Sequence, residues 1–247
     1  MSSPARAFAI LDLFSRERPV WSPDEINTAL GYSRPTGYRY VKDLVDAGLL
    51  RKVAAGHYAL GARIIELDYQ LRQSDPVLLA AAPVMQRLAR DSGFDAVLSV
   101  LYPGPRVIDV HRASGEPGLE LVYGRGRPRP VFIGAAPKVL LAHQPRSMLV
   151  RMHADHAAEI AASGMGDGWP SFRQALTEIR RQGWYRSHGE LQADVGAIAV
   201  PVLDAEGHGT HALALVGSLG RLQSQDDAQL QHWLFAAVNS FRGASTA

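Results

Sequence analysis

The segment from Ser22 to Gly61 limits the possible folds more than any other part of the chain, because it contains the start and stop signals of two short helices. Ser22-Pro23-Asp24-Glu25 combines a hydroxyl N-cap, a proline at the first helical position and a glutamate three residues after the cap, which is the capping-box pattern. We expect this helix to end at Gly31. A second helix is expected to begin after Ser33 and to end at Gly48, where a left-handed terminus favours glycine.

A hairpin is predicted directly after the second helix. Residues 49–53 and 57–60 are short runs of strand-forming residues, and Ala54-Ala55-Gly56 between them is a turn signal. Arg51 and Lys52 are expected near the tip of this hairpin. A helix, a tight turn, a second helix and a basic hairpin, in this order, are typical of a winged helix-turn-helix, which binds DNA.

The second helix carries the side chains that a helix needs in order to bind DNA. Its N-terminal half has no acidic residue before Asp43, so no carboxylate repels the phosphate backbone, and a helix start itself favours phosphate. The predicted DNA-binding residues are Ser33, Arg34, Thr36, Tyr38, Arg39 and Lys42 on this helix, with Arg51 and Lys52 on the hairpin. The alternative is a small helical hairpin whose positive face is only solvated surface.

Two further helices complete the N-terminal part. Residues 4–16 are predicted to form an amphipathic helix that packs behind the two DNA-side helices. Residues 62–72 are predicted to form another, and Ser74-Asp75-Pro76 then breaks the pattern. Its apolar stripe (Ile64, Ile65, Leu67 and Leu71) has two open interpretations, contact with a partner chain or packing within this chain. We therefore expect a DNA-binding domain at 1–61, a linker helix at 62–75 and a second domain at 76–247.

From Pro76 onward the pattern changes to a mixture of helices and strands. Helices are predicted at 78–91, 135–143, 147–163, 171–182 and 224–241, and strands at 96–101, 106–112, 119–123, 195–203 and 211–216, with another extended segment from Trp184. Tyr102-Pro103-Gly104-Pro105 joins the first two strands, and Asp204–Gly209 is a hairpin signal between the last two. Antiparallel strands with helices grouped around them indicate an α+β sensor-like domain rather than a Rossmann unit.

The composition limits which chemistry is expected. The chain has 247 residues, with 26 Lys and Arg against 24 Asp and Glu, so its formal net charge of +2 does not by itself indicate nucleic acid. The absence of cysteine excludes disulfides, thiolate metal ligands and a cysteine nucleophile. We find no signal peptide and no apolar run long enough to cross a bilayer, and therefore expect a soluble cytoplasmic protein without a membrane partner.

Several motifs that suggest an enzyme or a metal site are incomplete. The pairs His153/His156 and His208/His211 lack acidic partners at a distinctive spacing, and we interpret them as solvated surface histidines. Gly217-Ser218-Leu219-Gly220 only loosely resembles a nucleophile turn. The basic loop Gly124–Arg129 is either solvated, or gates a ligand site, or touches a neighbouring subunit. We predict no catalytic residue, metal or cofactor; the alternative is an enzyme of small carboxylic-acid metabolism with a helical head domain.

With these features in view, the chain resembles the IclR family of transcription regulators along almost its whole length. In the first domain the resemblance rests on Thr36, Arg39, Gly48-Leu49-Leu50 and Tyr58-Ala59-Leu60-Gly61. In the second it rests on the order and spacing of residues 134–142, 179–184, Gly189-Glu190 and 196–202. The resemblance implies a dimeric or tetrameric regulator that binds double-stranded operator DNA. It also implies a GAF-like C-terminal domain that binds a small-molecule effector, often a carboxylate.

The start of one predicted helix is the expected effector site. Gly134-Ala135-Ala136 lies where a loop becomes a helix, so backbone N–H groups beside small side chains can approach an anion. The family usually has glycine where this chain has Pro137, which removes one donor. Glu190 has two open interpretations, closing the pocket or capping a nearby turn.

The facing strands determine which kind of anion is expected. By resemblance they contribute Ala197, Ala214 and Val216, which are all apolar here, with Ser218 nearby as a hydroxyl donor. An apolar wall beside an anion site favours an aromatic or longer-chain carboxylate over a two- or three-carbon oxoacid. The alternative is that these three residues are simply part of the strand core.

Overall fold

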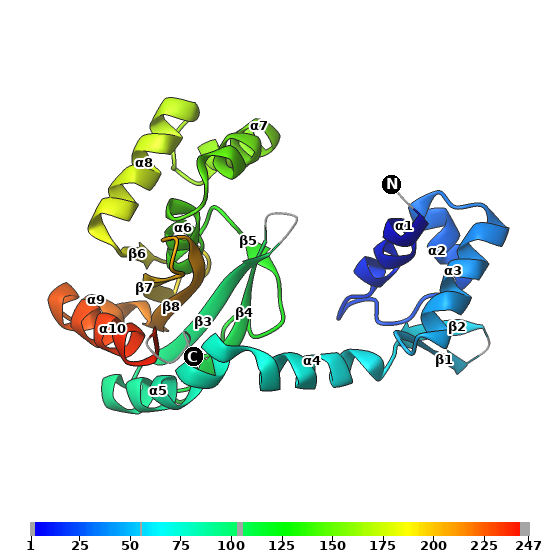
Figure 1. Cartoon of the computed structure of the whole chain (residues 1–247), viewed down its shortest axis with the longest axis horizontal. Coiled ribbons are helices and arrows are strands. Elements are labelled where there is room, and N and C mark those ends of the chain that lie inside the picture. Colours follow the sequence, from blue (N-terminus) through cyan, green and yellow to red (C-terminus); the bar gives the residue numbers. More distant parts are fainter. Residues whose placement is uncertain (1–2, 55, 103–105, 243–247) are drawn as a thin grey trace. The chain divides into compact units, whose positions relative to one another are not determined.

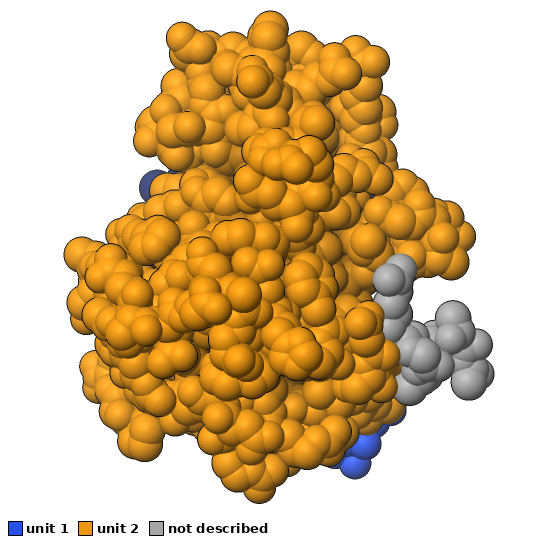
Figure 2. Space-filling model, turned by 90° about the vertical axis from the view of Figure 1, so that its left-hand side faces the viewer, with its two compact units in different colours: residues 1–75 blue, residues 76–247 orange. Residues whose placement is uncertain are grey.

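A computed structural model describes residues 3–54, 56–102 and 106–242. The chain divides into two compact units, Met1–Asp75 and Pro76–Ala247. Figure 1 labels their helices and strands, and Figure 2 gives each unit its own colour. No helix within the described ranges is long and apolar enough to cross a membrane.

The first unit is a winged helix-turn-helix, as predicted. Its elements are α1 (Ser3–Ala9), a short 3-10 helix η1 (Leu11–Leu13), α2 (Pro23–Leu30), α3 (Arg34–Asp46), β1 (Leu50–Ala54) and β2 (His57–Leu60). The capping box forms: the Ser22 hydroxyl accepts from the Glu25 amide at 3.3 Å, and the Ser22 amide donates to the Glu25 carboxylate at 2.7 Å. Gly31 ends α2 with φ of 67°, a left-handed conformation that glycine adopts readily.

The first helix is shorter than the predicted range 4–16. It ends at Ala9 and is followed by η1, because Ile10 turns into the core beside Trp21 and Ile26. The Trp21 indole N–H donates to the Leu13 carbonyl oxygen at 3.0 Å, which takes up an acceptor that a continuing helix would use. The apolar side chain of Phe8, which was expected to pack in the core, is 57% exposed.

The helix α4 (Arg63–Ser74) has no buried residue among those described. Its apolar side chains are among the most exposed in the chain, with Ile65 74% and Tyr69 65% exposed. The structure therefore does not show this stripe packed within the chain, which was one of the two interpretations of the sequence.

The second unit is built on an antiparallel six-stranded sheet in the order β5-β4-β3-β8-β7-β6. The strands are β3 (Asp95–Tyr102), β4 (Arg106–Ala113), β5 (Arg129–Pro130), β6 (Tyr185–His188), β7 (Val195–Leu203) and β8 (Gly209–Ser218). The helices are α5 (Pro76–Ser92), α6 (Ala135–Ala142), α7 (Arg146–Ala162), α8 (Trp169–Gln182), α9 (Leu219–Gln223) and α10 (Asp227–Arg242). The predicted α+β class is confirmed.

The sheet separates two apolar cores, because alternate residues of a strand point to opposite faces. Leu98 and Leu213 pack with α5 and α10 on one face. Val97 and Ala214 pack with α6 and α8 on the other face. Figure 1 shows α5 and α10 on one side of the sheet and α6 and α8 on the other. The second face carries the cavity described below.

Three predictions for the second unit need correction or fall outside the structure. Residues 119–123 do not form a strand, because their backbone groups bind side chains: Leu119 O accepts from Arg112 at 2.8 Å, and the Val122 amide donates to Gln192 at 3.1 Å. The last helix begins at Asp227 rather than after Ser224, which ends the short α9. Residues 103–105 of the predicted β3–β4 connection lie outside the described residues.

Candidate functional site

The candidate DNA-reading surface is the exposed face of α3. Gly37, Tyr40, Val41 and Leu44 bury the opposite face of this helix in the core. Of the predicted contact residues, Ser33, Arg34, Tyr38, Arg39 and Lys42 are exposed and Thr36 is half-buried. Ser33 does not cap the helix backbone; its hydroxyl donates to Thr36 Oγ1 at 2.9 Å. The structure thus brings the α3 residues together on one solvent-facing surface.

The basic residues on this surface differ in how far their charge is compensated. The Arg34 guanidinium lies 3.4 Å from Asp24 Oδ1 and 5.5 Å from the centre of the Tyr38 ring. Arg39 lies 5.2 Å from the centre of the Tyr40 ring, and neither Arg39 nor Lys42 has a carboxylate partner among the described residues. Arg39 and Lys42 are therefore better placed than Arg34 to meet phosphate or a base edge.

The hairpin presents its two basic residues differently from the prediction. Arg51 pairs with Ala59 and Lys52 with Tyr58, so both lie within β1 rather than at the tip between Ala54 and His57. Because neighbouring residues of a strand point to opposite faces, one face of the hairpin carries only one of the two. Both side chains are exposed.

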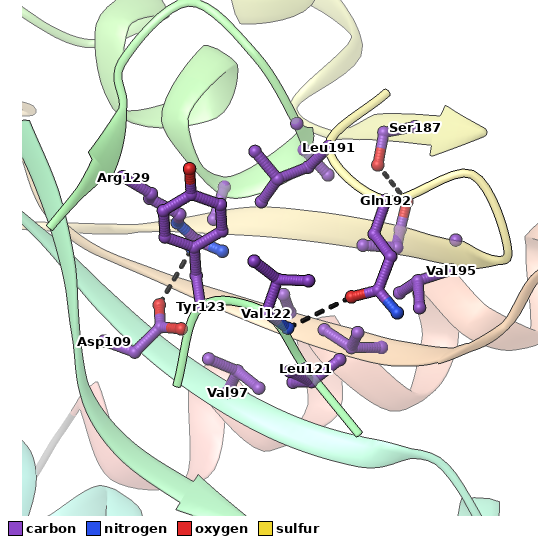
Figure 3. A pocket seen from close by; sticks show the side chains of 17 residues that line it. Val97, Asp109, Leu121, Val122, Tyr123, Arg129, Ser187, Leu191, Gln192 and Val195 are labelled. Carbon is purple, nitrogen blue, oxygen red and sulfur yellow. Dashed lines mark hydrogen bonds and ion pairs between the residues drawn. The ribbon is translucent and has the colours of Figure 1, made fainter. Parts of the chain in front are cut away.

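A cavity in the second unit lies between the sheet, the start of α6 and two loops (Figure 3). Its empty volume, mouth included, is about 570 Å³. It is lined by Val97, Asp109, Leu121, Val122, Tyr123, Arg129, Gly134, Ala135, Ala136, Ser187, Leu191, Gln192, Val195, Gly196, Ala197, Ala214 and Val216. Six of the eight predicted effector residues are in this list, and Glu190 and Ser218 are not.

The start of α6 gives the cavity wall two free amide donors. Gly134 precedes the helix with φ of 92°, which glycine tolerates best. Ala135 and Ala136 are 2% and 3% exposed, and their amides have no hydrogen-bond partner within the described part of the chain. Pro137 has no N–H, so it adds no donor. A carboxylate can accept from these two amides at the positive end of the helix.

Glu190 caps the start of α6 rather than lining the cavity. Its Oε2 accepts from the Gly134 amide at 2.9 Å and from Lys138 Nζ at 2.7 Å, and its Oε1 accepts from the Tyr185 hydroxyl at 2.9 Å. Burial raises the pKa of Glu190, but the hydrogen bonds from Lys138 and Gly134 outweigh it and hold this pKa below its ordinary value. Glu190 is thus a charged carboxylate that already occupies the Gly134 amide.

The sequence-based prediction missed a polar group at one end of the cavity. Arg129 donates to Asp109 Oδ1 and to the Ser99 hydroxyl, both at 2.8 Å, and Ser99 donates to Asp109 Oδ1 at 2.7 Å. Burial raises the pKa of Asp109, and Arg129 opposes this shift. The available signal was the position of Asp109 between the apolar residues Ile108 and Val110 of the predicted strand 106–112, because a carboxylate buried in such a strand needs a partner.

The loop that contains residues 121–123 and the loop that contains residues 191–192 both line the cavity, and the Gln192 side chain joins them. Gln192 accepts from the Val122 amide at 3.1 Å and donates to the Glu120 carbonyl at 3.2 Å, as Figure 3 shows in part. Tyr123 and Arg129, which flank the basic loop, both line the cavity. Arg127 donates back to the Val122 carbonyl at 2.8 Å, so this loop lies against the cavity's edge.

The other predicted chemistry lies elsewhere. Ser218 ends β8 and does not line the cavity. Its amide donates to the Glu116 carboxylate at 3.1 Å. His153 and His156 are half-buried rather than fully solvated: the His153 ring lies 5.8 Å from that of Trp169, and His156 contacts Glu159 at 2.8 Å. Among the described residues, no group of three or more histidines and acids could hold a metal ion.

Comparisons with known proteins agree with this arrangement. Residues 70–241 match the model of the bacterial transcriptional regulator IclR C-terminal domain, and residues 3–54 match that of the IclR helix-turn-helix domain. The HTH-type transcriptional regulator KipR of Bacillus subtilis is 24% identical over 86% of this chain and 84% of its own length.

Solved structures show the same fold. A transcriptional regulator from a Silicibacter species superposes with a TM-score of 0.81 at 22% identity, covering 99% of this chain and 96% of that one. An IclR homologue from Microbacterium hydrocarbonoxydans, complexed with 4-hydroxybenzoate, superposes with a TM-score of 0.74 at 22% identity and covers 99% of both chains.

Proposed function

Because the chain belongs to the IclR family of bacterial transcriptional regulators, we propose that it binds operator DNA and that an aromatic or other hydrophobic carboxylate modulates this binding. It has the family's helix-turn-helix DNA-binding domain and effector-binding C-terminal domain. The relatives are transcriptional regulators, so the alternative of an enzyme of small carboxylic-acid metabolism has no support. As a protein that binds chromosomal DNA, it would act in the cytoplasm.

The proposed roles follow the two units. Residues 1–61 bind DNA through α3 and the hairpin, residues 62–75 link, and residues 76–247 bind the effector. The exposed face of α3 supports the first role, since no described carboxylate forms an ion pair with Arg39 or Lys42, and Tyr38 adds a hydroxyl donor. Phosphate contacts from such residues set the register, and base contacts set the specificity.

The observation that carries the effector class is the pair of buried amides at Ala135 and Ala136 beside an apolar wall. The amides suit a carboxylate. Val97, Ala214 and Val216 offer no hydrogen bond and suit a hydrophobic body. The 4-hydroxybenzoate bound by the Microbacterium relative supports an acid of this kind.

The functional form is proposed to be a homo-oligomer, either a dimer or a tetramer. The apolar stripe of α4 is exposed in the single chain, and covering it with a second copy removes Ile65, Tyr69 and Leu71 from water. A dimer would present two α3 helices to two half-sites about one or more helical turns of DNA apart.

Ligand control requires that the effector bind one arrangement of the DNA-binding units better than another. The cavity lies under loops that Gln192 holds together, so an entering acid must separate them or pass between them. We infer that the ligated and free states differ in these loops.

A thermal-shift panel of aromatic and aliphatic carboxylates tests this proposal. A ligand at about a hundred times its dissociation constant adds roughly 2.7 kcal/mol of stability, which raises the melting temperature measurably. We expect shifts from aromatic acids and none from acetate or pyruvate. Ala136→Asp places a carboxylate in the cavity wall and should abolish the shift, whereas Ala193→Asp, which adds the same charge at an exposed position outside the lining, should keep it. Shifts from short acids alone would contradict the proposal.

A further inference from the structure

Two hydrogen-bonding atoms of the Arg129–Asp109 pair, which lines the cavity, are not contacted by any other described side chain. Arg129 Nε is buried and has no partner within the described part of the chain. Its Nη2 atom is used by Ser99 and Asp109. Within the described residues, the side-chain contacts of Asp109 with Ser99 and Arg129 are both made by Oδ1, so Oδ2 can accept from a ligand. A buried N–H without an acceptor is costly, and a group that satisfies it gains affinity.

The position of this pair separates it from the α6 amides. Arg129 lies on β5 and Asp109 on β4, whereas the amides belong to α6. Figure 3 shows Arg129 and Asp109 together beside Tyr123, with the apolar Leu121 and Val122 between them and Gln192. The cavity therefore has a second polar end within a wall that is otherwise largely apolar.

The opposite charges of Arg129 and Asp109 determine which kind of ligand group can bind to them. Arg129 is only 12% exposed and Asp109 3%, and each neutralises the other at 2.8 Å. A second anion placed here would meet the Asp109 carboxylate, and a purely apolar group would leave Nε unsatisfied. A neutral group that both accepts and donates, such as a hydroxyl, satisfies both atoms.

Building on the proposed function, we propose that Arg129 and Asp109 recognise a hydroxyl on the effector. The hydroxyl oxygen accepts from Arg129 Nε, and its proton is donated to Asp109 Oδ2. The effector class is therefore a hydroxyl-substituted aromatic carboxylate, and these two residues determine specificity for the hydroxyl.

Isothermal titration calorimetry with matched acids tests the proposal. The probes are benzoate, 3- and 4-hydroxybenzoate, and 3- and 4-methylbenzoate, in which a methyl group replaces the hydroxyl at nearly equal size. We expect the full-length protein to bind one hydroxybenzoate roughly 10- to 100-fold more tightly than its methyl counterpart. Arg129→Lys keeps a cation beside Asp109 but lacks Nε–H, and should lose most of this preference.

A second variant tests the proposal even if Arg129→Lys does not fold. In Arg129→Met/Asp109→Leu both members of the buried pair become apolar, a change that is often neutral or stabilising. This variant should prefer the methyl acids. Equal affinity of the wild type for hydroxyl and methyl acids overturns this proposal alone, and so does a preference that persists in both variants. Failure of every aromatic acid to bind overturns the proposed effector class as well.

Discussion

The carboxylate of Glu190 accepts a hydrogen bond from the Gly134 amide at 2.9 Å, so the chain places an acidic group of its own at the start of α6. Lys138, whose side chain is 6% exposed, donates to the same oxygen at 2.7 Å. Glu190 therefore compensates a buried ammonium and fixes the loop that carries Leu191 and Gln192 over the cavity. An effector carboxylate is left with the Ala135 and Ala136 amides.

Removal of the Glu190 carboxylate should destabilise the second unit. Glu190→Ala leaves the Lys138 ammonium buried, with the Tyr185 hydroxyl as its one remaining partner among the described residues. We expect the free energy of unfolding to fall by about 3 kcal/mol, the low end for a broken buried ion pair, because Glu190 itself is 24% exposed. Urea unfolding measures this change. The double variant Lys138→Met/Glu190→Leu should recover most of the loss; a double variant as unstable as Glu190→Ala would show that Lys138 is not the reason.

The same carboxylate should contribute to acid unfolding. Its pKa is lower in the folded protein than the ordinary 4.5, so its stabilising contribution is complete above that value and is lost as the pH falls through the folded pKa. Glu190→Gln cannot ionise and should show a shallower loss of stability below about pH 4.5 than the wild type. Melting temperatures between pH 6 and pH 3 test this, and parallel curves for the two proteins would refute it.

Arg39 should contribute directly to DNA binding. Arg39→Ala removes an exposed guanidinium that has no carboxylate partner in the described chain, and should weaken specific binding by roughly 1–3 kcal/mol if it contacts a base edge. Fluorescence anisotropy with a duplex selected by the protein from a random library provides the measurement. Arg87→Ala, an exposed arginine on α5, is the matched control. Unchanged affinity in Arg39→Ala would remove this side chain from the reading surface.

The apolar stripe of α4 should hold the oligomer together. Ile65→Asp puts a charge on the most exposed apolar side chain of the helix and should shift the protein towards the monomer in light scattering after gel filtration. Gln70→Asp adds the same charge at an exposed polar position of the same helix and should leave the mass unchanged. If both variants keep the wild-type mass, the stripe is not the contact between subunits.

Much of the first unit could be predicted from the sequence because its signals are local. The Ser22–Glu25 capping box and Gly31 act within a few residues of one another, and both formed as expected. The predicted helix 4–16 was too long because the contact that ends it, from Trp21 to the Leu13 carbonyl, depends on packing rather than on periodicity.

The cavity could be predicted only in part. The family resemblance located Gly134, Ala135, Ala136 and the facing strand residues, which do line it. It could not decide the role of Glu190, whose partner Gly134 is 56 positions away. The predicted strand 119–123 became a loop over the cavity because Arg112 and Gln192 satisfy its backbone, and no sequence pattern indicates such long-range side-chain contacts.

Control of DNA binding by the effector requires that the cavity and the DNA-reading surface be coupled, and the most direct test measures both affinities in the same protein. The dissociation constant for the selected duplex is measured with and without a saturating aromatic acid, and that for the acid with and without the duplex. We predict that the acid changes DNA affinity by roughly 5- to 150-fold and that the duplex changes acid affinity by the same factor, as linkage requires. Tight binding of both ligands with no effect of either on the other would contradict the account.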